Sequence, residues 1–262
     1  MGKDSYFCHM KNDHLIFVPE VDSTINYLSD IVRDKELNHQ KLAELTAVFT
    51  DWQSAGRGQQ GNVWASNPKE NILISFYFSP SIIPQEQFFM NIFFSLSVRK
   101  MLEKYLPEVK IKWPNDIYVE DKKIAGILLD HTLQNNRILH TIAGVGININ
   151  QMQFPDTVAN PTSLKLLTEQ NFELLPLIEE LHAITSYYYN MLKQGNYLQL
   201  LKEYYQNLYR INEYHSFIIH NEEKEAKILG INQFGQLQLE DRHRNFYQCG
   251  MKEINYRLSI NK

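Results

Sequence analysis

The sequence is poor in cysteine: Cys8 and Cys249 are the only two in 262 residues, and they stand at opposite ends of the chain. They show no metal-ligand spacing, so the sequence indicates neither a disulfide framework nor a zinc site. The signature motifs His-Glu-x-x-His and Gly-x-Ser-x-Gly are also missing. The scarcity of thiols favours a reducing compartment, and we expect a cytoplasmic protein.

Long apolar runs are missing too. The most apolar region, Phe88 to Val98, is interrupted by Asn91 and Ser95 and is too short to cross a bilayer. The first residues are polar and carry no signal core, and they leave no room for a separate module ahead of the first predicted strand. We therefore expect no membrane association and no N-terminal DNA-binding domain.

The chain also has no excess of positive charge, since 26 Lys and Arg face 30 Asp and Glu, which gives a net charge of −4. A protein that binds nucleic acid usually presents a strong basic field. We expect no nucleic-acid partner, and an anionic ligand would have to be bound by local groups.

The most informative stretch runs from Thr50 to Trp64 and contains Gly56, Gly58 and Gly61 around Arg57. We call residues 56–64 the glycine loop. Its spacing is Gly-x-Gly-x-x-Gly, but a β-branched and aromatic run at residues 72–78 follows where a dinucleotide-binding fingerprint needs a helix. Two interpretations stay open at this point: a loop whose backbone amides approach an anion, and a glycine-rich hairpin without a ligand.

Three other stretches carry polar groups or glycines next to apolar segments. Residues 22–24, Asp-Ser-Thr, precede a helical pattern and are candidate N-caps or ligand contacts. The apolar strand predicted at 123–129 begins with Lys123 and contains Gly126. A third predicted strand, 142–148, is interrupted by two glycines and ends at Asn148. Glycine inside a strand often marks the close approach of a ligand or another backbone.

The remaining pattern mixes strands and helices. Leu15 to Val18 reads as a strand closed by Pro19, and helices are predicted after Pro84 and at about 173–193 and 197–209. We expect His131 and His140, which flank a predicted hairpin, to lie at the surface. From residue 212 onward, short strands separated by glycines predict a small β-barrel. We therefore expect two domains, residues 1–211 and 212–262.

Together these stretches resemble the biotin protein ligases, which attach biotin to a lysine of a carrier protein. The resemblance rests on four segments in the family's order, and it covers nearly the whole chain. They are Asp22-Ser23-Thr24, the glycine loop, Lys112-Trp113-Pro114-Asn115-Asp116 with Lys123 to Leu128, and Gly144-Val145-Gly146-Ile147-Asn148. It implies an α+β fold in which a mixed β-sheet is flanked by helices, as in class II aminoacyl-tRNA synthetases and biotin ligases, with a small C-terminal SH3-like β-barrel.

The resemblance also implies the chemistry: biotin and ATP form biotinyl-5′-AMP with Mg²⁺, and a biotin carboxyl carrier protein domain accepts the biotin on its lysine. Arg57 and Lys123 are the implied catalytic residues, and Asp116 is the implied metal ligand. The residues implied for biotin are Ser23, Thr24, Gln53, Gly56, Arg57, Gly58, Gln59, Lys123 and Gly126. Those implied for ATP are Arg57, Gln59, Asn62, Trp64, Lys112, Asn115 and Asn148.

The sequence departs from the family pattern at two positions. Gln59 stands where the family often has a basic residue, and Ile25 replaces the asparagine that commonly follows Ser-Thr. Two other functions stay open: a lipoate ligase or octanoyl transferase, whose Arg-Arg-x-Ser-Gly-Gly-Gly loop is absent here, and a non-catalytic module that binds biotin. A monomer and a homodimer are both compatible with the sequence.

Overall fold

The predicted strands of the first 150 residues assemble into one sheet of seven strands in the computed structural model, which describes residues 14–257. Their order across the sheet is β1-β2-β3-β7-β6-β5-β4. In chain order the strands are β1 (Leu15–Val21), β2 (Ala47–Gln53), β3 (Asn71–Phe78), β4 (Val109–Lys112), β5 (Asp116–Val119), β6 (Lys122–Gln134) and β7 (Arg137–Asn148). The sheet is mixed, because β1 and β2 are parallel and the other pairs are antiparallel.

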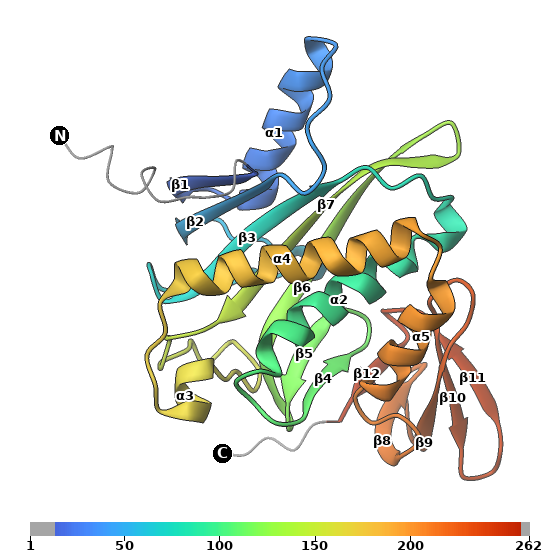
Figure 1. Ribbon diagram of the computed structural model, residues 1–262. Helices are drawn as coiled ribbons and strands as arrows, with labels where there is room; N and C mark the ends of the chain where they lie inside the picture. The colour runs from blue at the N-terminus through green and yellow to red at the C-terminus, as the bar shows by residue number, and fades with distance from the viewer. Residues whose placement is uncertain (1–13, 258–262) are drawn as a thin grey trace.

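Helices cover both faces of this sheet, which confirms the predicted fold class (Figure 1). Side chains alternate between the faces of a strand, so Ile74 and Phe76 of β3 pack in the cluster that contains α2 (Phe88–Leu102) and α4 (Leu174–Lys193). Tyr77 points the other way, into a smaller cluster with α1 (Thr24–Leu37). The candidate site lies on the α1 face.

A second sheet is built from the C-terminal strands, in the order β11-β10-β9-β8-β12. Its strands are β8 (Tyr214–Ile219), β9 (Glu222–Ile231), β10 (Leu237–Asp241), β11 (Phe246–Cys249) and β12 (Ile254–Tyr256). All its pairings are antiparallel, which fits the expected SH3-like domain, but the strand order is that of an open sheet rather than a closed barrel. Helix α5 (Tyr197–Gln206) leads into this sheet (Figure 1).

Short helical segments complete the fold: η2 (Gln59–Gly61), η3 (Pro84–Glu86) and α3 (Leu164–Thr168). Between α5 and β8 the chain passes from one sheet to the other, because Leu208 pairs with Ile111 of β4 and Ile211 pairs with Ile228 of β9. The predicted domain boundary at residue 212 falls next to this crossing.

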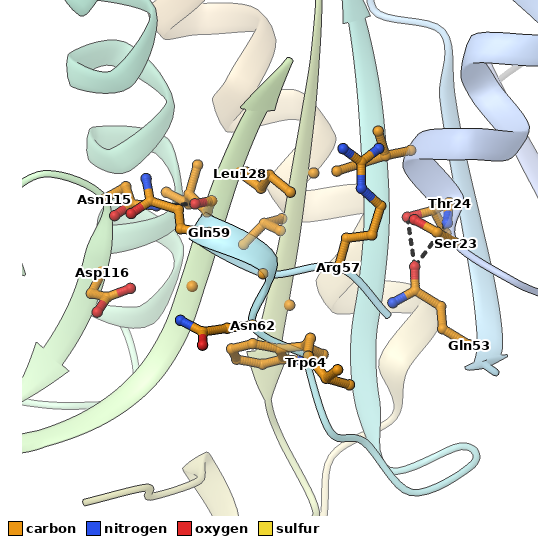
Figure 2. Close-up of a pocket in the computed structure, with 18 of the residues that line it drawn as sticks. Ser23, Thr24, Gln53, Arg57, Gln59, Asn62, Trp64, Asn115, Asp116 and Leu128 are labelled. Carbon is orange, nitrogen blue, oxygen red and sulfur yellow. Dashed lines mark hydrogen bonds between the residues drawn. The ribbon is translucent and has the colours of Figure 1, made fainter. Parts of the chain in front are cut away.

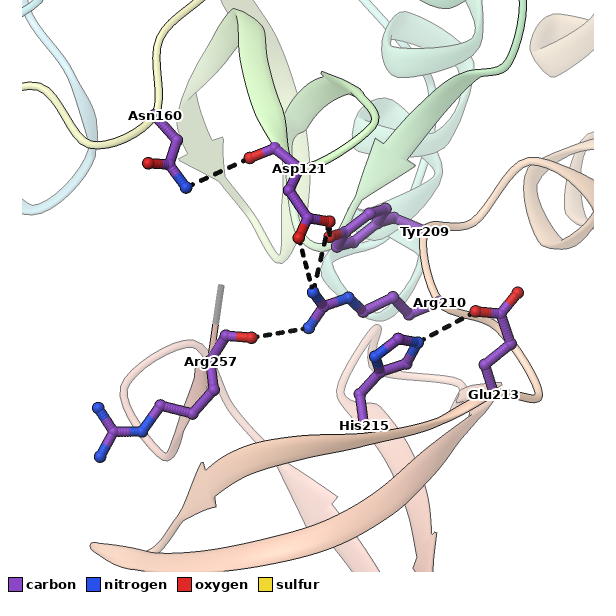
Figure 3. Close-up of polar contacts among 7 residues, drawn as sticks. All are labelled: Asp121, Asn160, Tyr209, Arg210, Glu213, His215 and Arg257. Atoms are coloured by element: carbon purple, nitrogen blue, oxygen red, sulfur yellow. Dashed lines mark hydrogen bonds and ion pairs between the residues drawn. The ribbon is translucent and has the colours of Figure 1, made fainter. Parts of the chain in front are cut away.

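A polar link joins the two sheets at the turn between β5 and β6 (Figure 3). Arg210 donates from Nη2 to the two carboxylate oxygens of Asp121 at 3.4 and 3.3 Å, and from Nη1 to the Arg257 carbonyl at 2.9 Å. Tyr209 donates its hydroxyl to the same carboxylate. Only 8% of the Arg210 side chain is exposed, so this ion pair is more shielded from solvent than an ordinary surface pair.

Some expectations were wrong in detail. Strand β1 does not end at Pro19 but continues to Val21, which an edge strand tolerates because one side of it makes no ladder bonds. His140 is not a surface residue: it is 7% exposed, with its ring beside Tyr77 and its Nδ1 3.4 Å from Glu36. Cys249 is free and buried, whereas Cys8 lies outside the described residues. No helix in residues 14–257 is long and apolar enough to cross a membrane.

Candidate active site

The floor of the site is a patch of sheet with almost no side chains. Gly126 of β6 and Gly146 of β7 are register partners, and Leu128 is the partner of Gly144 one step along. These four residues share the face of the sheet that α1 covers, because Ile142, in phase with Gly144 and Gly146, packs in the α1 cluster. The alternating glycines therefore leave room above the backbone on this face.

Trp64 of the glycine loop packs against the glycine pair, and Figure 2 shows its indole beside Asn62. A Cβ at Gly146 would lie 2.2 Å from Trp64 Cε2, and a Cβ at Gly126 would lie 2.9 Å from Cζ3, so only glycine admits the indole at either position. Trp64 Nε1 is buried and has no hydrogen-bond partner among the described residues. Lys123 Nζ lies 5.7 Å from the ring centroid. The indole and the Lys123 ammonium group thus lie together at the wall of the pocket.

A polar cluster forms one end of the pocket where α1 begins. The side-chain oxygen of Gln53 accepts from Thr24 N at 2.8 Å and from Thr24 Oγ1 at 3.0 Å, and Thr24 Oγ1 lies 2.7 Å from Ser75 Oγ. Ser23 is the N-cap residue, yet its hydroxyl makes no capping bond and is buried without a partner in residues 14–257. Because a buried hydroxyl is normally hydrogen-bonded, Ser23 Oγ, which lines the pocket, is a candidate ligand contact.

Arg57 lies across the mouth of the pocket. Its Nη1 donates to Asn26 Oδ1 at 3.0 Å on α1, and its Nη2 lies 3.6 Å from Asp130 Oδ2 on β6. Asn26 in turn donates to Asp22, and this hydrogen bond is the main reason that the pKa of Asp22 lies below its usual value. The guanidinium therefore bridges the two walls, pointing toward the Ser23 end of the pocket (Figure 2).

The glycine loop is closed on itself as a tight hairpin. Gly58 N donates to Asn62 O at 2.7 Å, and Trp64 N donates to Gly56 O at 3.0 Å. A Cβ at Gly56 would lie 2.6 Å from the Trp64 carbonyl, so Gly56 permits the close approach of the two legs. The Gly58 amide, expected to face the ligand, is occupied within the loop, and it can reach a ligand only if this bond opens.

An acidic and basic group forms the other end of the pocket. Asp116 at the start of β5 accepts from Lys123 Nζ at 2.7 Å, and Lys112 Nζ lies 4.0 Å from its other oxygen. Burial lowers the pKa of Lys112, an effect that Asp116 partly offsets. The side chains of Lys123 and Asp116 are 27% and 20% exposed, so solvent screens their charges less than it screens charges at the surface.

Two predicted asparagines have mainly structural contacts in this state. Asn115 is 4% exposed and donates to the Ile127 carbonyl, which fixes the turn before β5 against β6. Asn148 donates to the Thr162 carbonyl at 2.9 Å, while its Oδ1 has no partner within the described part of the chain.

The pocket is a hollow of about 190 Å³. Most predicted residues line it: Ser23, Thr24, Gln53, Arg57, Gly58, Gln59, Asn62, Trp64, Asn115, Asp116, Lys123 and Gly126. Three predicted residues, Gly56, Lys112 and Asn148, do not line it. The site residues that were not predicted are Ile25, Val63, Ile127, Leu128, Gly144, Val145 and Gly146. The sequence contains a pattern that could have identified three of them. Leu128 is two residues from Gly126, and Gly144 and Gly146 are two and four residues from Ile142, so each lies on the same face of its strand as that residue.

Comparison with protein families agrees with this geometry. Residues 18–148 match the model of the biotin/lipoate A/B protein ligase family, a segment that contains most of the pocket lining. The chain belongs to this family. The family segment extends from β1 to the end of β7, so it coincides with the first sheet.

Curated relatives match over part of their length. The chain is 28% identical over 172 residues to the bifunctional ligase/repressor BirA of Escherichia coli, which is 63% of this chain and 51% of that protein. It is 32% identical over 174 residues to the chloroplastic biotin–protein ligase 1 of Arabidopsis thaliana, 64% of this chain and 45% of that protein. The chain thus spans about half the length of these relatives.

A solved structure shows the same fold along nearly the whole chain. The biotin protein ligase of Aquifex aeolicus in complex with biotin and ATP superposes with a TM-score of 0.73, covering 95% of this chain and 100% of that one at 24% identity. The combined arrangement of a flanked mixed sheet and a C-terminal antiparallel sheet is therefore a known fold of this family.

Proposed function

We propose that the protein is an ATP-dependent biotin protein ligase. The biotin carboxylate attacks the α-phosphorus of ATP, the bond to the leaving diphosphate breaks, and biotinyl-5′-AMP forms. A lysine amine of a biotin carboxyl carrier domain then attacks the acyl carbon and AMP leaves. The observation that carries the proposal is that Arg57 and Lys123 both line a pocket whose other end is the polar Ser23–Thr24–Gln53 cluster. Binding the neutral ureido ring alone would need neither cation.

The first step joins two anions, so it needs positive charge where they meet. We assign this role to Lys123, which stands at the pocket wall beside Asp116, and to Arg57 at the mouth. The polar cluster is suited to the ureido group, because Thr24 and Gln53 are hydrogen-bonded to each other. Ser23 Oγ has no hydrogen-bond partner in residues 14–257 and can bond to the ligand. The related structures bind biotin with ATP or as biotinyl-5-AMP according to their names, which supports this assignment.

We place the nucleotide on the side of the pocket lined by Gln59, Asn62, Trp64 and Asn115. Lys112 lies next to this side through its 4.0 Å approach to Asp116, and Asn148 stays a prediction. Asp116 fits a magnesium ligand. It is a carboxylate at the pocket wall, and Mg²⁺ commonly binds through one or two carboxylates plus phosphate oxygens. No cluster of three His, Cys, Asp or Glu suited to a metal occurs in residues 14–257, so the phosphates would supply other ligands. Bound Mg²⁺ neutralises phosphate charge.

The second step needs a water-free pocket, because water would hydrolyse the mixed anhydride. We assign water exclusion to the glycine loop, whose Arg57 already bridges the two walls of the mouth. Consumption of ATP and a free, buried Cys249 both fit the cytoplasmic location predicted from the cysteine content.

The decisive experiment measures pyrophosphate release with ATP and Mg²⁺, comparing biotin with lipoate, which the family description also includes. We expect release to depend on biotin. Release that responds to lipoate and not to biotin would reject the proposal in favour of a lipoate ligase. No release with either compound, together with biotin binding, would indicate a non-catalytic module.

A further inference from the structure

Ile25 packs directly over a glycine in the pocket wall. It stands in the first turn of α1, is 3% exposed, and lines the pocket. A Cβ built on Gly144 would lie 2.6 Å from Ile25 Cδ1 and 2.7 Å from Ile25 Cγ1. The isoleucine therefore fills the space that any side chain at position 144 would need, and the two residues are matched in size.

This seat lies between the polar and apolar parts of the pocket. Leu128, the register partner of Gly144, also lines the pocket and packs against the same small cluster as Ile25. On the other side, the Gly144 Cβ position is 3.2 Å from Ser75 Oγ, which is bonded to Thr24. Ile25 and Leu128 therefore form an apolar wall in the same pocket as the Thr24 and Gln53 cluster.

We propose that Ile25, seated on Gly144, is a specificity-determining residue that contacts the apolar ring of the vitamin and sets how closely the ring fits. The inference rests on the proposed function. It names a residue that is not among those the family resemblance implies, because the family commonly has asparagine at this position. A ring that fills an apolar pocket binds more tightly than one that leaves a gap. A difference of one methylene changes the discrimination between two ligands by roughly 10- to 200-fold.

The test uses one substitution that removes side-chain volume, one that adds it, and their combination. Ile25→Ala opens the wall, and we expect it to weaken biotin binding about tenfold or more. It should also reduce the preference for biotin over desthiobiotin, which lacks the sulfur-bearing ring. Gly144→Ala drives the isoleucine into the pocket and should weaken binding of both compounds. The Ile25→Ala/Gly144→Ala double variant should recover much of the affinity, because the new methyl occupies the vacated space.

Calorimetric dissociation constants for biotin and desthiobiotin provide the readout, with biotin-dependent pyrophosphate release measured in parallel. Val32→Ala is the control: Val32 packs in the same cluster on the same helix but does not line the pocket, so it should lower the melting temperature without altering ligand preference. Additive losses in the double variant, or an unchanged preference in Ile25→Ala, would overturn the inference. Wild-type protein that binds biotin but releases no pyrophosphate would refute the ligase proposal alone, and absence of biotin binding would refute both.

Discussion

Lys123 Nζ lies 2.7 Å from Asp116 Oδ1, which makes the cation at the pocket wall the partner of the one carboxylate proposed to bind magnesium. The pair is partly buried, so its charges are less screened than those of surface pairs. If Asp116 held Mg²⁺, the carboxylate would be shared with the metal, and the Lys123 ammonium group would be available to the incoming anion. The same contact positions both groups before the substrates arrive.

The role of Lys123 predicts the effect of its removal. Lys123→Ala should lower the rate of pyrophosphate release by on the order of a hundredfold, because it removes one preorganised donor to the reacting phosphate. Biotin affinity should fall much less. Rapid-quench measurement of pyrophosphate and calorimetric biotin binding separate the two effects. The neighbouring Lys122, which does not line the pocket, provides the control Lys122→Ala. A Lys123→Ala enzyme with the wild-type rate would refute the assigned role.

The seat of Trp64 predicts the outcome of a single added methyl group. Gly146→Ala would place Cβ 2.2 Å from Trp64 Cε2, so the indole must leave the floor. We expect tryptophan emission to shift to longer wavelength and kcat/KM to fall on the order of a hundredfold, as a displaced positioning group commonly costs. Fluorescence and steady-state kinetics measure both.

Gly250→Ala is the matched control, because the nearest atom to its added Cβ is the Glu253 carboxylate at 3.4 Å. It should leave emission and kinetics unchanged. If Gly146→Ala retains both the emission maximum and the rate, Trp64 is not part of the working site.

Much of the site was predictable because local chemistry reveals it. Glycines in the loop and inside two strands pointed to bare backbone, and Lys123, Asp116 and Ser23 all line the predicted pocket. Side-chain partners were not predictable. That the Gly58 amide is bonded to Asn62, or that Ile25 fills the space beside Gly144, depends on how distant segments approach in three dimensions.

The fold shows the same limit. Alternating patterns placed most strands, but β6 and β7 extend beyond the predicted bounds. The burial of His140 depends on packing beside Tyr77 and Glu36, which are distant in the sequence. The β-propensity of individual residues does not reveal such contacts between segments that are distant in the sequence.

A buried amide network predicts how the glycine loop is anchored. Asn71 donates to Gln151 Oε1 at 2.5 Å and to Ser66 Oγ at 2.9 Å, and its own Oδ1 accepts from Ile149 N at 3.0 Å. Gln151 Oε1 also accepts from Asn67 N at 3.1 Å. The return leg of the loop is therefore tied to the end of β7 through two side chains that are each 1% exposed.

Gln151→Leu should cost about 1–3 kcal/mol of unfolding free energy, because the buried Asn71 side-chain amide and the part-buried Asn67 N–H lose their shared acceptor. It should also speed cleavage of residues 56–67 in limited proteolysis and raise the dissociation constant for biotin. Urea denaturation and mass spectrometry of early fragments give the measurements. The exposed Gln153 offers the control Gln153→Ala, since only its backbone carbonyl joins the network. Equal proteolysis of the two variants would show that the network does not anchor the loop.

Two buried histidines, His140 and His182, and the half-buried His131 predict how stability depends on pH. Burial is the main cause that lowers the pKa of His131, His140 and His182 below the usual 6.5. Between the folded and unfolded pKa values the unfolded chain binds more protons, so the unfolding free energy falls as pH decreases through this window. We therefore expect urea midpoints to decrease from pH 7 to pH 5, before the carboxylates titrate.

Substitution of one of these histidines tests this origin. In His140→Gln the loss of stability on acidification should be smaller than in the wild type, because the variant has one fewer group that must be charged on unfolding. The neighbouring Glu36, 3.4 Å from His140 Nδ1, acts in the opposite direction but more weakly than burial. His243→Gln, at an exposed histidine, should retain the wild-type slope. A slope in His140→Gln that equals the wild-type slope would mean that burial of this ring does not govern the acid sensitivity.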